Sequence, residues 1–140
     1  MSSEHRAHPV VRSMFAQTIL VFAMACAGTP TGPLETGVWG GTGVAMTVTA
    51  SGASLEFDCA TGSIAGRIVV IDERFSLPGI FILEHGGPVH ENEPPDQRAA
   101  TYAGRLSGSA MQLDITLEDG TRIGPFEVRK DRSPVLRKCA

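Results

Sequence analysis

A six-residue stretch, Ser54–Cys59, constrains the fold of this chain more than any other part. It reads Ser-Leu-Glu-Phe-Asp-Cys, so Leu55, Phe57 and Cys59 fall on one face and the polar residues fall on the other. Strict alternation is typical of a half-buried β-strand, because successive side chains of a strand point to opposite faces. The stretch therefore predicts a core strand that carries Cys59 on its buried face.

Similar short alternating segments follow one another along most of the chain, and none has a helical period. The 16 Gly and 9 Pro indicate many turns. Asp119-Gly120 is a strong hairpin signal, and Gly124-Pro125 interrupts the alternation in the way that a β-bulge does. The other predicted strands cover Val44–Thr49, Ile64–Ile71, Phe75–Leu83, Ala100–Leu106, Ala110–Leu117 and Thr121–Arg129, with a turn at Ala60–Ser63.

These segments predict an all-β fold of about seven or eight strands. Short turns favour a small antiparallel up-and-down β-barrel, in which closure leaves no unpaired edge. A β-sandwich is the alternative. The inward positions carry mostly large apolar residues, so we expect side chains to fill much of the interior.

Residues 1–26 have the pattern of a signal peptide. Arg6 and Arg12 precede an apolar run, Met14–Ala25, that is shorter than the roughly 20 residues needed to span a bilayer. The Ala23–Cys26 segment that ends this run resembles the lipobox of bacterial lipoproteins. The resemblance implies lipidation of Cys26, an N-terminal membrane anchor, and a location in the periplasm or at the cell surface. Ordinary cleavage after Ala25 is the alternative.

The remaining chain divides into two parts. Residues 27–36 are rich in Gly, Pro and Thr and have no periodicity, which indicates a flexible tether. Residues 37–140 form the predicted barrel domain. Of the three cysteines, Cys59 and Cys139 remain once Cys26 is assigned to the anchor. An even pair in an exported protein predicts a disulfide between them.

The first predicted strand of the domain contains Gly37-Val38-Trp39, which is similar to the Gly-x-Trp motif of lipocalins and their calycin relatives. In that group an arginine on the last strand covers the tryptophan, which implies this role for Arg129. A core tryptophan at the start of a strand is the alternative. The chain also resembles a group of small exported bacterial proteins without an assigned activity, which implies fold and compartment only. The matching stretches are Trp39-Gly40-Gly41, Leu55–Cys59, Glu84–Val89, Tyr102-x-Gly104, Met111-x-Leu113 and Cys139.

One long predicted loop, Glu84–Arg98, is the candidate binding segment, since long loops in compact domains are often functional. Its candidate binding residues are Glu84, His85, His90, Glu91, Glu93 and Asp96. His and carboxylate side chains suit zinc, but their spacing matches no ligand pattern, so we predict no metal. A solvated acidic loop is the other interpretation.

The net charge and the absence of known catalytic motifs argue against several classes of protein. A net charge of -3 without a basic stripe argues against nucleic-acid binding. The chain contains no nucleophile elbow, zinc-protease motif or P-loop, so we predict neither an enzyme nor a cofactor. We expect a binding module whose ligand is a small apolar molecule in the barrel or a protein at the loop. A structural cell-envelope protein is the alternative, and an enzyme is the least favoured.

Overall fold

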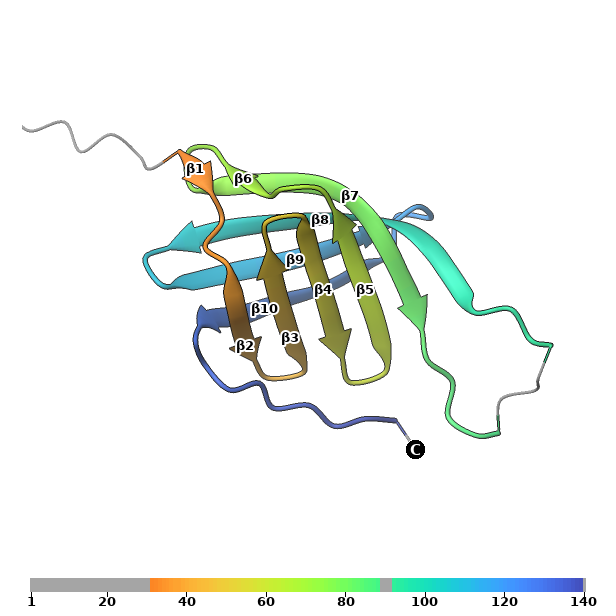
Figure 1. Ribbon diagram of the computed structural model, residues 1–140. Helices are drawn as coiled ribbons and strands as arrows, with labels where there is room; N and C mark the ends of the chain where they lie inside the picture. The colour runs from red at the N-terminus through yellow and green to blue at the C-terminus, as the bar shows by residue number, and fades with distance from the viewer. Residues whose placement is uncertain (1–30, 89–91, 140) are drawn as a thin grey trace, which may run out of the picture.

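The computed structural model describes residues 31–88 and 92–139, and this part of the chain contains no helix. Eight antiparallel strands close into a barrel in the order β10-β2-β3-β4-β5-β7-β8-β9 (Figure 1). The predicted up-and-down barrel is therefore confirmed, and the sandwich is excluded. The barrel strands are β2 (Gly37–Gly41), β3 (Val44–Thr49), β4 (Gly52–Phe57), β5 (Ala60–Ala65), β7 (Arg74–Leu83), β8 (Asp96–Ser107), β9 (Ala110–Leu117) and β10 (Arg122–Lys130).

Among the described residues there is no helix of the length and apolarity that crossing a membrane requires.

The chain enters β7 through a tight turn. Asp72 and Glu73 both adopt positive φ angles of 50° and 62°, which produces a tight turn of the handedness that suits antiparallel strands. β10 closes the barrel by pairing with β2, from Val128 opposite Gly41 to Lys130 opposite Trp39. The predicted bulge at Gly124-Pro125 is confirmed by a register shift between Ile123 and Phe126.

The predicted cysteine strand is shorter than its alternation indicates. β4 ends at Phe57, which pairs with Ala60, so Asp58 and Cys59 form a two-residue turn. Cys59 is half-buried in that turn, and its predicted place on the buried face of the strand is wrong. Residues 60–63, expected to turn, begin β5 instead. Two residues suffice to reverse the chain here, and alternation alone does not distinguish a strand end from the turn that follows it.

The predicted strand Ile64–Ile71 is also divided. β5 ends at Ala65, and Gly66 follows with a φ of +87°, a conformation that glycine adopts without strain. The chain then leaves the barrel wall to form β6 (Val69–Val70), which pairs with β1 (Gly32–Pro33) in a separate two-stranded sheet.

Residues 32–36, which we assigned to the tether, belong to the folded domain. The Leu34 side chain is only 4% exposed, and its backbone N–H donates to the Ile68 carbonyl over 2.8 Å. The Trp39 indole Nε1 donates to the carbonyl of Glu35 over 3.0 Å. The described domain therefore begins before Gly37, because an apolar residue in this Gly/Pro-rich segment packs on the core.

Large side chains fill the barrel. The largest fully buried side chains, each at most 2% exposed, are those of Trp39, Val44, Met46, Leu55, Ile68, Tyr102, Met111, Leu113, Ile115 and Val128. Phe57 stacks at a tilt on both Phe81 and Phe126, with ring centroids 5.4 and 5.3 Å apart. The buried Tyr102 hydroxyl donates to the Ile80 carbonyl over 2.7 Å, so its polar group is satisfied. These contacts confirm the expectation of a filled interior.

The C-terminal segment folds back along the barrel and ends at the predicted disulfide. The Asp131 N–H donates to the Val38 carbonyl, and Val135 forms a parallel bridge with Thr42. Cys139 then bonds to Cys59, with the two Cα atoms 5.2 Å apart. The Cys59–Cys139 disulfide is therefore confirmed. The described residues between 32 and 139 form a folded unit that contains every described strand, the closing ladder and the disulfide.

Candidate functional site

The predicted binding loop lies at the end of the barrel away from β1 and β6 (Figure 1). It joins Leu83 of β7 to Asp96 of β8, which pair with each other. His85 and Glu93 are exposed in this loop, and the candidates His90 and Glu91 lie outside the described residues. A pocket of about 410 Å³ opens beside the loop. Its lining comprises Leu83, Glu84, His85, Gly86, Gly87, Pro88, Glu93, Pro94, Pro95 and Cys139.

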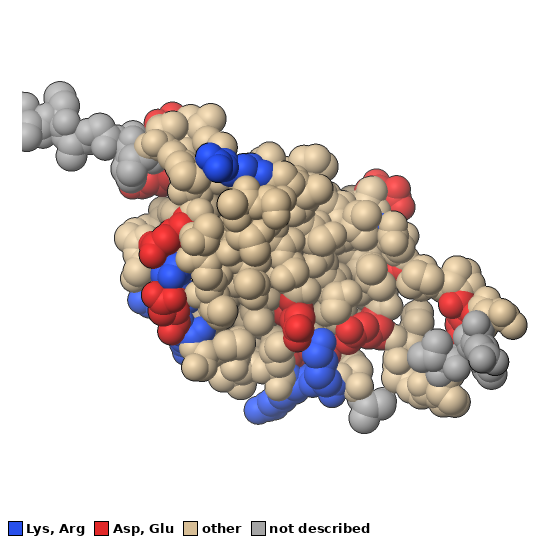
Figure 2. All heavy atoms as spheres, viewed as in Figure 1, with Lys and Arg blue, Asp and Glu red and all other residues tan. Residues whose placement is uncertain are grey.

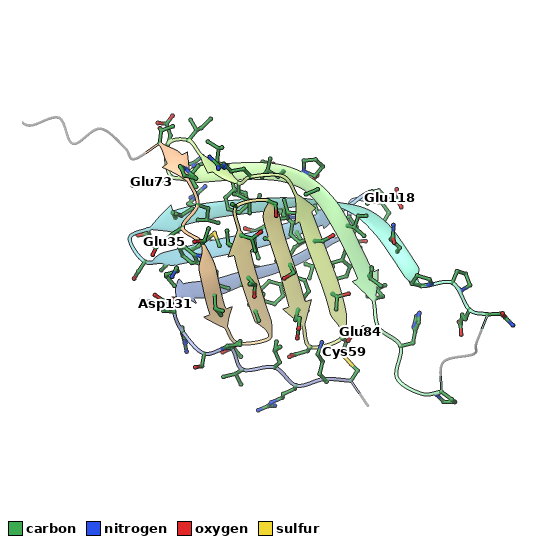
Figure 3. The ribbon with its side chains drawn as sticks, in the orientation of Figure 1. Glu35, Cys59, Glu73, Glu84, Glu118 and Asp131 are labelled. Atoms are coloured by element: carbon green, nitrogen blue, oxygen red, sulfur yellow. A yellow bond between two sulfur atoms is a disulfide. The ribbon has the colours of Figure 1, made fainter. Side chains whose placement is uncertain are left out.

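Among the described loop candidates, Glu84 and Asp96 interact with basic side chains of the barrel rim. Glu84 lies close to the Cys59 turn (Figure 3), and its Oε2 is 3.4 Å from the Nζ of Lys138. Asp96 is the first residue of β8, and its Oδ1 accepts a hydrogen bond from the Nε of Arg98 over 3.0 Å. That bond lowers the pKa of Asp96 and raises the pKa of Arg98. These carboxylates therefore help to fix the barrel rim.

The described residues contain no group of three or more His, Cys, Asp or Glu side chains placed to hold a metal ion.

Arg129 does not cover Trp39. It is exposed on the outer face of β10, and both its Nε and its Nη2 donate to Glu127 Oε1, over 3.1 and 2.9 Å. The residue directly opposite Trp39 is Lys130, whose side chain is 12% exposed. Its Nζ lies 2.6 Å from Asp131 and 3.5 Å from Glu35, and the bond with Asp131 raises the Lys130 pKa. The bulge at Gly124-Pro125 shifts the alternation of β10 and so sets which residue faces inward.

A larger cavity lies on the outer wall, where the sequence predicted nothing. It has a volume of about 620 Å³ and opens between the β6 segment and the outer faces of β7, β8 and β9. We call it the arginine groove. Its lining residues are Arg67, Val69, Ile71, Arg74, Phe75, Ser76, Leu77, Ala103, Gly104, Arg105 and Asp114.

The three arginines of this groove make no ion pair with any described residue, whereas five of the other seven described basic residues do. Five of the other basic side chains each lie within 4.0 Å of a carboxylate: Arg98, Arg122, Arg129, Lys130 and Lys138. Arg67, Arg74 and Arg105 are exposed and have no such partner among the described residues. Three arginines that form no ion pair with a described residue therefore line one concave surface.

Two of these arginines occupy opposed positions in the sheet. Arg74 of β7 pairs directly with Arg105 of β8, and both side chains are on the outer face because their neighbours Phe75 and Gly104 face the core. Like charges in directly opposed positions destabilise a sheet. An anion between them would remove that repulsion and receive charge-assisted hydrogen bonds.

The groove also has an apolar wall. Val69 and Ile71 are 44% and 59% exposed, two of the largest exposures among the apolar residues of the described chain. Both lie on the face of the β6 segment opposite to the buried Ile68 and Val70. Figure 2 shows basic side chains beside the corner formed by β1 and β6, with acidic side chains near them on the same face.

The acidic side chains around the groove are few and identifiable. Asp114 is in its lining and lies 4.0 Å from the Arg122 guanidinium. Asp72 and Glu73 form the turn between β6 and β7, next to Arg74.

The sequence held one indication of the groove, because the segment Arg67–Ile71 is apolar on both faces and only one face can pack on the core. The pairing of Arg74 with Arg105 was not visible, since it depends on the register of two strands.

Comparisons of the chain with protein-family models, with curated proteins and with solved structures found no match.

Proposed function

We propose that this protein is an exported, lipid-anchored β-barrel that acts as a binding module and holds an anionic ligand on its outer wall, in the arginine groove. The anchor is Cys26, and the location is the periplasm or the cell surface. The observation that carries the proposal is the direct pairing of Arg74 with Arg105, neither of which forms an ion pair with a carboxylate among residues 31–88 and 92–139. In this function the protein is not an enzyme and needs no cofactor or metal.

The filled barrel supports a ligand outside the barrel rather than within it. Met46, Tyr102 and Ile115 have no exposed surface, so an apolar molecule in the interior would have to displace core side chains. The interior ligand expected from the sequence is therefore not part of the proposal. A groove of several hundred Å³ is in the size range of small-molecule sites.

Arginine side chains suit this role for a chemical reason. A guanidinium presents a rigid fork of N–H donors that pairs with both oxygens of a carboxylate or phosphate. Two opposed guanidiniums bind one anion from both sides and lose their mutual repulsion when they do so. Such a site discriminates by charge, so neutral analogues of the ligand should bind far more weakly.

Inorganic phosphate is a simple probe of this proposal. The chain Ala27–Ala140, which contains the folded unit 32–139, is labelled with ¹⁵N and titrated with phosphate at low ionic strength. We expect the arginine Nε–H resonances of Arg67, Arg74 and Arg105 to shift and saturate. Those of Arg132 and Arg137, which also lack a described carboxylate partner, serve as internal controls. Equal, non-saturating shifts at all five arginines would show general screening and refute the proposed site.

Export and anchoring are tested separately with the full chain in a bacterial host. Intact-mass analysis of the mature protein should give residues 26–140 plus lipid on Cys26, with two hydrogens fewer than the reduced chain. A Cys26→Ser variant should lose the added mass and leave the membrane fraction. An unmodified N-terminus at Cys26 would support ordinary cleavage instead.

A protein partner at the loop pocket is the second candidate function. The pocket beside Leu83 and Pro94 is partly apolar, and it lies at the opposite end of the barrel from β1, where the chain from the anchor arrives. A photo-crosslinking residue at Glu93, compared with one at the exposed Thr47, tests it in the native envelope. A single adduct at Glu93 alone would favour this function, and no adduct would favour a structural envelope role.

A further inference from the structure

We propose that the ligand of the arginine groove is a single anionic membrane lipid, with its charged headgroup between Arg74 and Arg105 and its first chain carbons against Val69 and Ile71. The inference rests on the proposed function, since it names the ligand class of the same site.

The composition of the groove decides between a lipid and a small hydrophilic anion. A site for inorganic phosphate needs donors and gains nothing from apolar walls. Here the arginines share the groove with Val69 and Ile71, which are 44% and 59% exposed, and with the half-buried Leu77. Exposed apolar side chains that line a concave surface are typical of a binding site. The lining therefore fits a ligand with one anionic and one apolar end.

The groove lies close to the proposed lipid anchor, and therefore close to membrane lipids. β6 carries Val69 on one side of the groove and pairs with β1, which begins at Gly32. Only six peptide units separate Cys26 from Gly32, and a fully extended chain of that length spans about 20 Å. A lipid on Cys26 would hold this corner of the barrel near the membrane surface, where lipid is the most abundant anion-bearing amphiphile.

The acidic side chains favour one lipid in the groove over a flat contact with the membrane. Asp72 and Glu73 stand at the turn that follows β6, and Glu35 and Asp131 lie on the same side of the barrel (Figure 3). An anionic bilayer pressed against this side would meet these carboxylates as well as the arginines. A single headgroup between Arg74 and Arg105 would share the groove with Asp114 but would not lie against Glu35 and Asp131, which are not part of its lining.

Three matched probes test the inference on the ¹⁵N-labelled chain Ala27–Ala140. Glycerol 3-phosphate carries the charge without chains, dihexanoyl phosphatidylcholine carries the chains without net charge, and dihexanoyl phosphatidylglycerol carries both. Each is titrated below its micelle concentration, and the Nε–H resonances of the groove arginines report occupancy. We expect phosphatidylglycerol to bind at least about tenfold more tightly than either other probe, a difference of about 1.4 kcal/mol.

Matched variants then assign the two ends of the ligand. Val69→Thr with Ile71→Thr keeps the branched shape and should remove most of the advantage of phosphatidylglycerol over glycerol 3-phosphate. Arg67→Gln with Arg105→Gln should weaken both anionic probes, and the equally charged control Arg132→Gln with Arg137→Gln should weaken neither. All of these side chains are exposed, so the variants should fold.

The outcomes separate the two proposals. Equal affinity for glycerol 3-phosphate and phosphatidylglycerol would overturn the lipid and leave the anion site in place. Equal affinity for the two lipids would overturn the lipid inference and remove the charge selectivity on which the proposed function rests. Absence of saturable binding by all three probes would overturn both.

Discussion

Arg74 and Arg105 lie directly opposite each other in the β7–β8 ladder, and neither forms an ion pair with a carboxylate in the part of the chain that the structure describes. In an unliganded barrel this arrangement is unfavourable, because directly opposed like charges repel. It persists beside a cavity of about 620 Å³ that also exposes Val69 and Ile71. We therefore propose that this surface is maintained for binding rather than for stability.

The first prediction follows from this repulsion. Arg74→Gln should stabilise the unliganded protein by about 0.5 kcal/mol, within the range measured for cross-strand pairs. The same substitution should weaken anion binding. Urea unfolding at low ionic strength measures the first effect, and phosphate titration measures the second. Arg132→Gln removes the same charge from an arginine without an opposed partner, and should leave both quantities unchanged.

A loss of stability in Arg74→Gln would contradict this account, because it would mean that the arginine pair is compensated in the unliganded state. High salt provides a further check. It screens exposed charges, so the stability difference between wild type and variant should shrink as salt is added.

The disulfide supports a second prediction. The bond joins residues 80 positions apart, and the chain-entropy model assigns such a crosslink about 4 kcal/mol, an upper value because it neglects strain. Cys59→Ser with Cys139→Ser should therefore lower the free energy of unfolding by up to that amount, measured by urea unfolding. Reductant should destabilise wild type and have no effect on the double variant. Coincident melting of oxidised and reduced wild type would show that the crosslink adds no stability.

The alternation of apolar and polar residues was sufficient to predict the barrel, because each strand could be recognised from its own sequence. Met111, Leu113 and Ile115 alternate without interruption, and all three are fully buried in β9. Cys59 and Cys139 could be paired once Cys26 was assigned to the anchor, and the disulfide is present.

The errors arose where tertiary contacts override local pattern. Leu34 stands in a segment with the composition of a tether, but it packs on the core through contacts with residues far along the chain. Cys59 continues an alternating run but lies in a turn, since its position depends on where β5 begins. Arg129 was assigned to cover Trp39 by resemblance alone, but it follows the buried Val128 and therefore lies on the outer face of β10. The arginine groove depends on strand register and on the departure of β6 from the wall, so no sequence motif identifies it.

Tyr102 supports a third prediction, concerning pH. Burial raises the pKa of its hydroxyl above the ordinary value of 10.0, because the charged phenolate is poorly solvated in the core. The folded state thus binds the proton more tightly than the unfolded state. The resulting stability is fully present below about pH 10 and is lost as the pH rises towards the folded pKa. Tyr102 is the only tyrosine, so phenolate absorbance reports it directly.

Alkaline titration of the folded protein should show phenolate absorbance appearing only at the pH of unfolding. Tyr102→Phe should reduce this alkaline loss of stability. At neutral pH the same variant should cost about 1 kcal/mol, because it removes the hydrogen bond to the Ile80 carbonyl. A phenolate that forms near pH 10 while the protein stays folded would contradict the buried, bonded position of this side chain.

The loop between β7 and β8 supports the last prediction. Leu83 already pairs with Asp96, so the barrel ladder does not depend on the residues between them. Replacing residues 85–94 with Asn-Gly should leave Glu84 in contact with Lys138. Shortening the connection should raise the free energy of unfolding by up to about 1 kcal/mol, since a shorter loop costs less entropy to close. Phosphate binding in the arginine groove, at the other end of the barrel, should be unchanged, while any partner crosslinked through Glu93 should be lost. Marked destabilisation would instead show that the loop is part of the core structure and that the pocket beside Leu83 is packed rather than open for binding.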